Sequence, residues 1–391
     1  MNKEERLISL CQEAVRIPSM SGQEKQVAEL MKHTMTSYGF DEVNIDKYGS
    51  VLGLIHGSRP GRTILMDGHI DTVDVIDRDQ WTHDPFAAEI EDGKIYGRGT
   101  SDMKGSVCAM ITAAAQYAED TGKDFAGTIC VSCTVHEECF EGVSSREISR
   151  NAKPDFVIIG EATTTTVKIG QRGRAEVVVE TKGKSCHSSN PEKGVNAVYH
   201  MMAVIEAIRD IQVNEHPILG KGILELTDII SSPYPGASVV PSICRATFDR
   251  RTLVGEDEAL ILGQVEEAIE KARKKVPDLK ARVFLAEGKE QCWTGETIEA
   301  KRYFPAWLID EKDELVQKAL AGLKEAGIDA PISHFSFCTN GSHFCGEAGI
   351  PCIGFGPSLE SLAHVRDEYI EIDQLKKACR GFYGILSQLT K

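Results

Sequence analysis

The sequence predicts an α/β fold in which a smaller α+β domain interrupts a larger, discontinuous domain. At 391 residues the chain exceeds what one ordinary hydrophobic core accommodates, so two domains are expected. Strand-like apolar runs alternate with amphipathic helices in residues 1–172 and again in residues 286–391, which is typical of a sheet covered on both faces. Residues 173–285 instead alternate apolar and polar side chains within runs, as strands with one buried face do.

The first part is expected to begin with amphipathic helices over residues 4–17 and 23–39. A long helix of small residues should start near Lys104, and a short helix is expected near residues 143–151. The predicted strands are "VLGLIHG" (51–57), "TILMDGHIDTV" (63–73), "KIYGRG" (94–99), "GTICVSCTV" (127–135) and "DFVIIGE" (155–161).

The inserted domain is predicted to have the element order β-α-β-β-α-β, which is that of a ferredoxin-like two-layer sandwich. Its predicted elements are a strand in 174–189, a helix in 194–210, strands at 222–230 and 243–252, a helix in 257–276 and a strand at 280–286. After residue 286 a helix over 313–327, the segment "PCIGFGP" and a C-terminal helix are expected to complete the larger domain.

Composition and charge exclude several classes of function. The formal net charge of -15 argues against a surface for nucleic acid or anionic lipid. No run approaches the roughly 20 apolar residues that a membrane span needs, and the charged N-terminus does not read as a signal peptide. Twelve scattered cysteines are typical of buried small hydrophobes in a cytoplasmic protein. Cys130 and Cys133 form a CxxC spacing, but they lie in one apolar strand without a second such pair.

Polar residues at the ends of predicted strands are the candidates for chemistry, because α/β proteins bind ligands there. His69 and Asp71 in "DGHIDTV" share a strand face, so the histidine can bind a metal while the aspartate fixes its tautomer. A lone histidine would more often be structural. Asp102 in "GRGTSDMKG" replaces the last glycine of a dinucleotide fingerprint, which we therefore reject. Asp102 is either a helix N-cap or a carboxylate able to bridge two cations.

Three further acids and one histidine follow the same pattern. Glu137 and Glu138 end an apolar strand, where charge is costly unless something neutralises it. Glu161 ends another strand, and His364 follows a glycine-rich loop. With His69 and Asp102, these groups offer nitrogen and oxygen ligands without thiolates, a set that suits zinc, with cobalt or manganese possible. Two metal ions sharing a bridging carboxylate would use five groups and leave one glutamate as a base.

These segments together resemble the M20 family of metallopeptidases and amidohydrolases. The combination of "GQRGRAEVVV", "FSFCTNG", "IGFGPS" and "AHVRDE" is most similar to its YgeY-like branch of selenium-metabolism-linked hydrolases. The resemblance runs nearly end to end, and the order of the motifs makes it specific. The matching segments are "AVRIPSMSGQE", "GHIDTV", "GRGTSDMKG", "HEE", "GEAT", "GKSCHSSNPEKGVNA", "FDRRTLVGED" and "AHVRDE". It implies a zinc-exopeptidase-like catalytic domain with a mixed central sheet and an inserted lid and dimerisation domain.

The resemblance also implies roles for single residues. Asp102 would be the bridging ligand, His69 and Glu161 would complete one metal site, and Glu138 and His364 the other. Glu137 would be the general base, and Asp71 would orient His69. His187 would reach the active site of a partner subunit and stabilise the oxyanion, although in a monomer it would be a surface histidine. Arg251 would grip a substrate carboxylate, with Arg250 as the alternative, and Asn340 and Gly341 would line the substrate pocket.

The activity that the resemblance implies is hydrolysis of an amide C–N bond in a small N-acyl amino acid or dipeptide, by a homodimer with two divalent ions per subunit. A ureido (carbamoyl) acid is the alternative substrate. A non-catalytic metal-dependent binding protein is the alternative from another class, which Glu137 disfavours, and cysteine-based redox chemistry is a third. The segment "TNGSHF" lacks an aspartate that many family members have, which leaves the substrate open. His343 in that segment is expected to face solvent.

Overall fold

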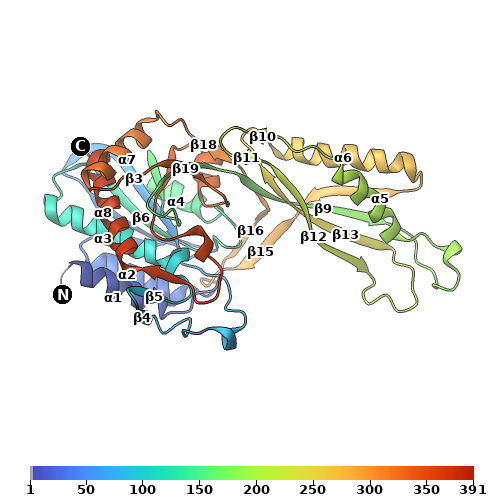
Figure 1. Cartoon of the computed structure of the whole chain (residues 1–391), viewed down its shortest axis with the longest axis horizontal. Coiled ribbons are helices and arrows are strands. Elements are labelled where there is room, and N and C mark those ends of the chain that lie inside the picture. Colours follow the sequence, from blue (N-terminus) through green and yellow to red (C-terminus); the bar gives the residue numbers. More distant parts are fainter. Residues whose placement is uncertain (1–2) are drawn as a thin grey trace. The chain divides into compact units, whose positions relative to one another are not determined.

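The computed structural model describes residues 3–391 and divides them into two compact units (Figure 1). The first unit holds the chain up to Gln171, residues 289–300 and the chain from Trp307 onward. The second unit holds residues 172–288 and 301–306. The sequence had assigned residue 172, residues 286–288 and residues 301–306 to the larger domain. They lie in the second unit because the short strand β17 (Tyr303–Phe304) pairs with β9 (Gly173–Lys182).

The first unit contains a mixed nine-stranded sheet, in the order β1-β2-β6-β3-β7-β20-β8-β18, with β19 paired to β8. The inner strands β6, β3, β7 and β20 are parallel to one another, whereas β1 and β2 are antiparallel to their neighbours. The strands are β1 (Glu42–Ile45), β2 (Val51–His56), β3 (Arg59–His69), β6 (Ala126–Thr134), β7 (Phe156–Ile159), β8 (Val167–Gln171), β18 (Trp307–Leu308), β19 (Ile332–Phe335) and β20 (Cys352–Gly354).

Both faces of this sheet are covered by helices. Alternate residues of each strand point to opposite sides of the sheet, so the inner strands contribute side chains to two cores. Ile64 and Met66 of β3 join a large core with five helices, whereas Leu65 joins a second core that includes Ile148 and Phe344. The helices of the large core are α1 (Lys3–Val15), α2 (Lys25–Ser37), α3 (Gly105–Thr121), α7 (Glu314–Glu325) and α8 (Ile372–Leu389). The other face is covered by α4 (Ser145–Ala152) and the π-helical segment η4 (Ser342–Glu347).

The second unit contains a five-stranded antiparallel sheet, in the order β12-β13-β9-β14 with the short β17 also paired to β9, and this sheet packs against two helices. The chain order β-α-β-β-α-β and this strand order are those of the predicted ferredoxin-like sandwich, so the fold class is confirmed. Alternate residues of β9, such as Val177 and Val179, form the core with both helices. The elements after β9 are α5 (Ala197–Arg209), β12 (Ile223–Ser232), β13 (Ile243–Thr252), α6 (Glu258–Lys275) and β14 (Lys280–Leu285).

The sequence analysis predicts one of several short strands, β5 (Lys94–Tyr96), within its run at 94–99, but misses the others because each is too short to show a period. A small sheet joins β21 to β5 and β4, and two hairpins pair β10 with β11 and β15 with β16. Their bounds are β4 (Ile90–Glu91), β5 (Lys94–Tyr96), β10 (Glu215–His216), β11 (Gly220–Lys221), β15 (Glu287–Gln291), β16 (Thr297–Lys301) and β21 (Tyr369–Glu371). Among the described residues no helix is both long and apolar enough to cross a membrane.

Helices α7 and α8 approach so closely that one backbone touches the other. A Cβ atom added to Gly322 would lie 2.2 Å from the carbonyl oxygen of Gly384. We expect Gly322→Ala to lower the free energy of unfolding by about 1–3 kcal/mol, since this contact cannot widen without repacking. Gly263 of α6 is the matched control, because a Cβ there meets nothing within 4 Å. Gly263→Ala should be stabilising by up to about 1 kcal/mol in urea unfolding, and equal effects of both substitutions would contradict this packing.

Candidate metal centre

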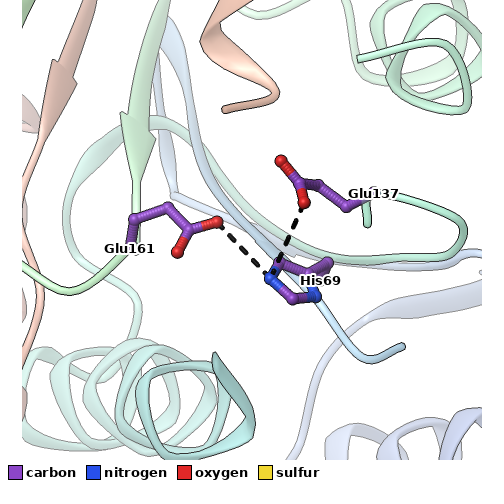
Figure 2. Close-up of side chains that lie close together, drawn as sticks. All are labelled: His69, Glu137 and Glu161. Carbon is purple, nitrogen blue, oxygen red and sulfur yellow. Dashed lines mark ion pairs between the residues drawn. The ribbon is translucent and has the colours of Figure 1, made fainter. Parts of the chain in front are cut away.

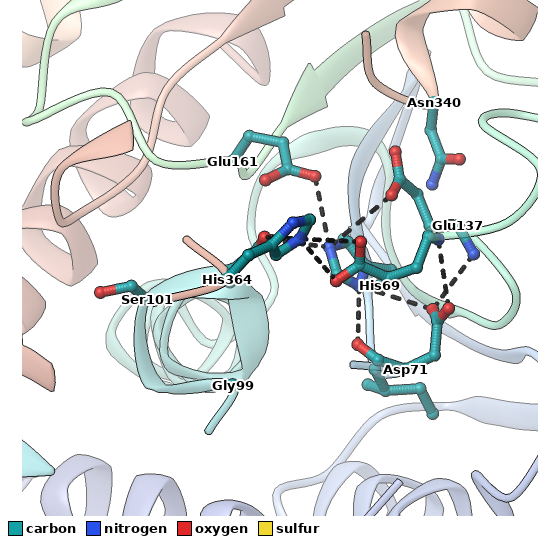
Figure 3. A network of polar contacts seen from close by, with 12 residues as sticks. His69, Asp71, Gly99, Ser101, Glu137, Glu161, Asn340 and His364 are labelled. Carbon is teal, nitrogen blue, oxygen red and sulfur yellow. Dashed lines mark hydrogen bonds and ion pairs between the residues drawn. The ribbon is translucent and has the colours of Figure 1, made fainter. Parts of the chain in front are cut away.

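The candidate residues meet at the carboxyl ends of three neighbouring parallel strands, β3, β6 and β7 (Figure 3). His69 is the last residue of β3, and Glu161 follows β7 by two residues. Glu137 and Glu138 lie in the turn just after β6, which ends at Thr134. The parallel pairing of these strands therefore brings together side chains that are far apart in the sequence.

Asp102 lies between the two histidines. Its Oδ1 is 3.0 Å from Nε2 of His69, and its Oδ2 is 3.1 Å from Nε2 of His364. Asp102 has extended dihedral angles of -129° and 92° within η2 (Thr100–Lys104), and Lys104 is the residue that caps α3. The N-cap alternative is therefore wrong, and the carboxylate is free to bridge.

One glutamate lies beside each histidine. Oε1 of Glu161 is 3.5 Å from Nε2 of His69, and Oε2 of Glu138 is 2.9 Å from Nε2 of His364. Figure 2 shows that Glu137 also points toward His69, with its Oε2 at 4.0 Å from Nε2. Donor atoms within 4.8 Å of one another form two sets that could hold a metal ion, which are His69, Glu137 and Glu161, and His69, Asp102 and Glu138.

The carboxylates of this cluster repel one another in a buried setting. Burial, with the nearby charge of Glu161, raises the pKa of Glu137 well above its ordinary value, although His69 opposes the shift. Burial and the charge of Asp102 raise the pKa of Glu161 to about 8, and the same two causes raise the pKa of Glu138. A cluster of this kind is stabilised by a positive charge placed among the oxygens.

The neighbouring carboxylates favour the protonated, positively charged form of both histidines. Hydrogen bonds to Asp102 and Glu138 raise the pKa of His364 to about 10. Burial opposes protonation of His69, but its contacts with Asp102 and Asp71 outweigh burial and raise its pKa well above the ordinary value. Protons on the imidazoles thus supply the positive charge that divalent cations would supply. Oε1 of Glu137 is buried without a hydrogen-bond partner, and the donor set is the imidazole and carboxylate set that zinc accepts, so these residues fit a metal centre.

Asp71 organises both the first histidine and the acid pair. Nδ1 of His69 is 2.9 Å from the carbonyl oxygen of Asp71 and 3.5 Å from its Oδ1. The same carboxylate accepts hydrogen bonds from the backbone N–H groups of Glu137 and Glu138, at 3.1 and 3.2 Å, and from the hydroxyl of Ser21 at 2.8 Å. Asp71 therefore fixes the turn that carries the acid pair as well as the ring of His69.

Glu368 supports the turn that carries Asp102, a role that the sequence analysis missed. Its carboxylate is fully buried and accepts the backbone N–H groups of Gly99 at 3.1 Å, Ser101 at 2.8 Å and Asp102 at 3.1 Å. The carboxylate of Glu368 also accepts a hydrogen bond from Nη1 of the buried Arg98 at 2.7 Å. Burial raises the pKa of Glu368 to about 7, although Arg98 opposes the shift. The one available signal was its place in "AHVRDE", four residues after His364.

Asn340 has an internal role rather than the expected substrate contact. Its Nδ2 donates to Asp67 and Thr134, both at 2.9 Å, and its Oδ1 accepts the backbone N–H of Gly142 at 2.7 Å. Both donor hydrogens are used, so Asn340 ties the 339–343 segment to β3 and β6. Gly341 is required by packing, because a Cβ there would lie 2.5 Å from Nε1 of Trp307.

His343 does not face solvent. It is buried, with Nδ1 2.8 Å from Glu347 and Nε2 2.8 Å from Ser149. Both ring nitrogens thus have partners inside the first unit. Cys130 and Cys133 are buried free thiols on β6, and burial raises the pKa of both, so neither of these two thiols offers a reactive thiolate.

The second unit contains the remaining two candidates. His187 is exposed, and its Nδ1 lies 2.8 Å from the hydroxyl of Ser189. Arg250 is buried and bonds to Glu256 at 3.0 Å, whereas Arg251 keeps partial exposure beside Asp249. Of these two arginines, Arg251 is therefore the one that a ligand can reach.

Comparison with known proteins gives one family and several relatives. The family model described as peptidase family M20/M25/M40 matches residues 65–388. The protein YgeY of Escherichia coli (strain K12) is 36% identical over 361 residues, covering 90% of this chain and 87% of that protein. Succinyl-diaminopimelate desuccinylase 2 of Ruegeria sp. (strain TM1040) is 30% identical over 257 residues, covering 62% of this chain and 64% of the relative. The crystal structure of aminopeptidase PepT from Bacillus cereus ATCC 10987 shares the fold, with a TM-score of 0.76 at 19% identity and 99% of both chains covered.

Removing the charge of Glu368 should disturb both stability and metal binding. Glu368→Gln leaves the buried Arg98 without its ion pair, which we expect to cost about 3–5 kcal/mol of unfolding free energy. It also loosens the turn that carries Asp102, so the metal content of purified protein should fall. Glu371→Gln, on an exposed side chain nearby, is the control. Unchanged urea unfolding and unchanged metal content in Glu368→Gln would show that the turn does not depend on Glu368.

Proposed function

Since the chain belongs to peptidase family M20/M25/M40 and is a hydrolase of amide-type C–N bonds, we propose that it uses two divalent metal ions, one on each side of Asp102. The observation that carries this proposal is the position of Asp102, with one carboxylate oxygen beside His69 and the other beside His364. A carboxylate shared between two ligand sets is the arrangement that two-metal hydrolases need.

The proposed ligand sets follow the pairs of neighbouring side chains. His69, Glu161 and Asp102 would hold one ion, and Glu138, His364 and Asp102 would hold the other. Glu138 is assigned as a ligand because it contacts His364 at 2.9 Å. Glu137 is assigned as the base because its Oε1 has no partner and its Oε2, at 4.0 Å from Nε2 of His69, lies farther from that nitrogen than the oxygens of Asp102 and Glu161 do. Zinc suits these donors best, and cobalt or manganese would also bind.

The chemistry divides between the ions and Glu137. When bound, two divalent ions would acidify a water molecule and polarise the carbonyl group of the substrate. Glu137 would take the proton from the attacking water and deliver it to the leaving nitrogen. The backbone hydrogen bond from Glu137 to Asp71 fixes the base relative to His69. A binding protein without catalysis would need the ligands but not this base.

We propose a small N-acyl amino acid or dipeptide as the substrate. The desuccinylase named above removes an acyl group from an amine, as its name states, and the aminopeptidase named above cleaves a peptide. Arg251, partly exposed at the end of β13, would bind a substrate carboxylate through its planar guanidinium group. Asn340 and Gly341 are left out of this proposal, because their contacts are internal.

We further propose a homodimer formed by the second unit. Strand β12 is an edge strand, and it exposes Ile229 and Ile230. Helix α5 of the same unit exposes Tyr199 and Met202. Natural proteins usually cover a long apolar edge strand, and a second copy of the chain would do so here. In this dimer His187 would reach the active site of the partner and stabilise the oxyanion.

All twelve cysteines are free thiols, which supports a cytoplasmic location.

The two neighbouring glutamates should respond differently to the same substitution. Glu137→Gln should keep its metal ions and lose turnover by about 10²–10⁴-fold, because the proton has no acceptor. Glu138→Gln should lower the metal content itself, because it removes a ligand. Elemental analysis and turnover of both purified variants test this division. Substantial turnover by Glu137→Gln would remove Glu137 as the base.

A mixing experiment tests whether His187 acts across a dimer. His187→Ala should lose about 10²–10³-fold in kcat, the cost of one oxyanion donor. Exchange of subunits between His187→Ala and Glu137→Gln should restore up to about a quarter of wild-type activity, because half of the dimers would contain one intact site. If the mixture stays as inactive as its components while mass analysis shows mixed dimers, His187 does not act in trans.

A further inference from the structure

A cavity of about 790 Å³ in the first unit opens onto the candidate metal ligands Glu138 and His364. Its other wall is formed by the segment that follows the His69–Asp71 motif, including Asp74, Ile76 and Asp77. Because Glu138 and His364 line the same cavity as this segment, a substrate that extends from the metal centre into the cavity would contact the segment. The side chains of the segment are therefore placed to distinguish one substrate from another.

The charges around the cavity are paired, with one exception. Arg366 is 2.8 Å from Asp77, and the buried Arg98 is 2.7 Å from Glu368. Asp74 is exposed, and within residues 3–391 its carboxylate has no hydrogen bond or ion pair with another side chain. The unpaired charge on this wall is thus a single negative one.

Metal ions bound at the centre would not make the net charge around the cavity positive. The four carboxylates of the centre offset the four positive charges of two divalent ions, so the potential in the cavity is set by the remaining groups. The cavity is also lined by the apolar side chains of Met20, Val73 and Ile76 and by uncharged polar side chains such as Ser21 and Gln23, none of which can neutralise Asp74. A positively charged group of the substrate would complement the carboxylate of Asp74.

We propose that Asp74 binds a protonated amino group of the substrate. This inference rests on the proposed function and narrows its substrate class to amides that carry a free ammonium group, such as dipeptides with an unblocked amino terminus. Substrates in which that amine is acylated would leave Asp74 without a partner. Asp79 lies on the same segment but outside the cavity, so position rather than local charge assigns this role to Asp74.

Matched substrate pairs test the inference on metal-loaded, full-length enzyme. Each pair consists of an unblocked dipeptide and its N-acetyl derivative, which differ in the ammonium group alone. The wild-type enzyme should prefer the unblocked member. Asp74→Asn should lower kcat/KM for the unblocked member by roughly tenfold or more, mainly through KM, and leave the acetylated member unchanged. Asp79→Asn, which removes the same charge from the same segment, should change neither.

The outcomes separate this inference from the proposed function. A wild-type preference for the acetylated member, or equal effects of Asp74→Asn on both members, would overturn the role of Asp74 and leave the hydrolase intact. If the metal-loaded wild-type enzyme cleaves neither member but hydrolyses an N-acyl amino acid, the inference fails and the proposed function stands. If it hydrolyses none of these amides, both fail. Equal metal content and equal urea unfolding of Asp74→Asn and wild type show that the variant is folded.

Discussion

The repulsion between buried carboxylates is the constraint on which the rest of this structure depends. Within residues 3–391, every ion pair of Asp102, Glu137, Glu138 and Glu161 is with His69 or His364. A protein gains nothing from burying four acids unless cations bind among them, because each buried charge is costly without a partner. The surrounding fold can be understood as the means of holding these acids in place against their own repulsion.

Three buried residues provide that support, and each accepts a hydrogen bond from at least one backbone N–H group, while Asp71 also contacts the ring of His69. Asp71 holds the turn of the acid pair, Glu368 holds the turn of Asp102, and Asn340 connects the strand ends to the 339–343 segment. Hydrogen bonds of this kind fix a ligand's direction before any ion binds, which lowers the cost of ordering the site. Burying these acids without a cation is unfavourable, and burial accordingly raises the pKa values of Glu137, Glu161 and Glu368.

The sequence predicted that these side chains would converge, because strand ends in an α/β protein lie together and polar residues after apolar runs are therefore informative at His69, Glu137, Glu138 and Glu161. The sequence could not predict which residues hold these side chains in place, because the supporting hydrogen bonds connect positions that are far apart in the chain. Glu368 and Asn340 act through contacts with residues more than 190 positions away, and no local period reveals such contacts. Short strands such as β18, and the return of residues 301–306 to the second unit, were missed because two paired residues leave no pattern.

The central claim is that two ions share Asp102, and diffraction from crystals of the zinc-loaded protein tests it most directly. Anomalous scattering measured at the zinc absorption edge should show two peaks per chain, one between His69 and Glu161 and the other between Glu138 and His364, with Asp102 between them. A single peak in zinc-saturated protein, or two peaks that do not share Asp102, would contradict the account.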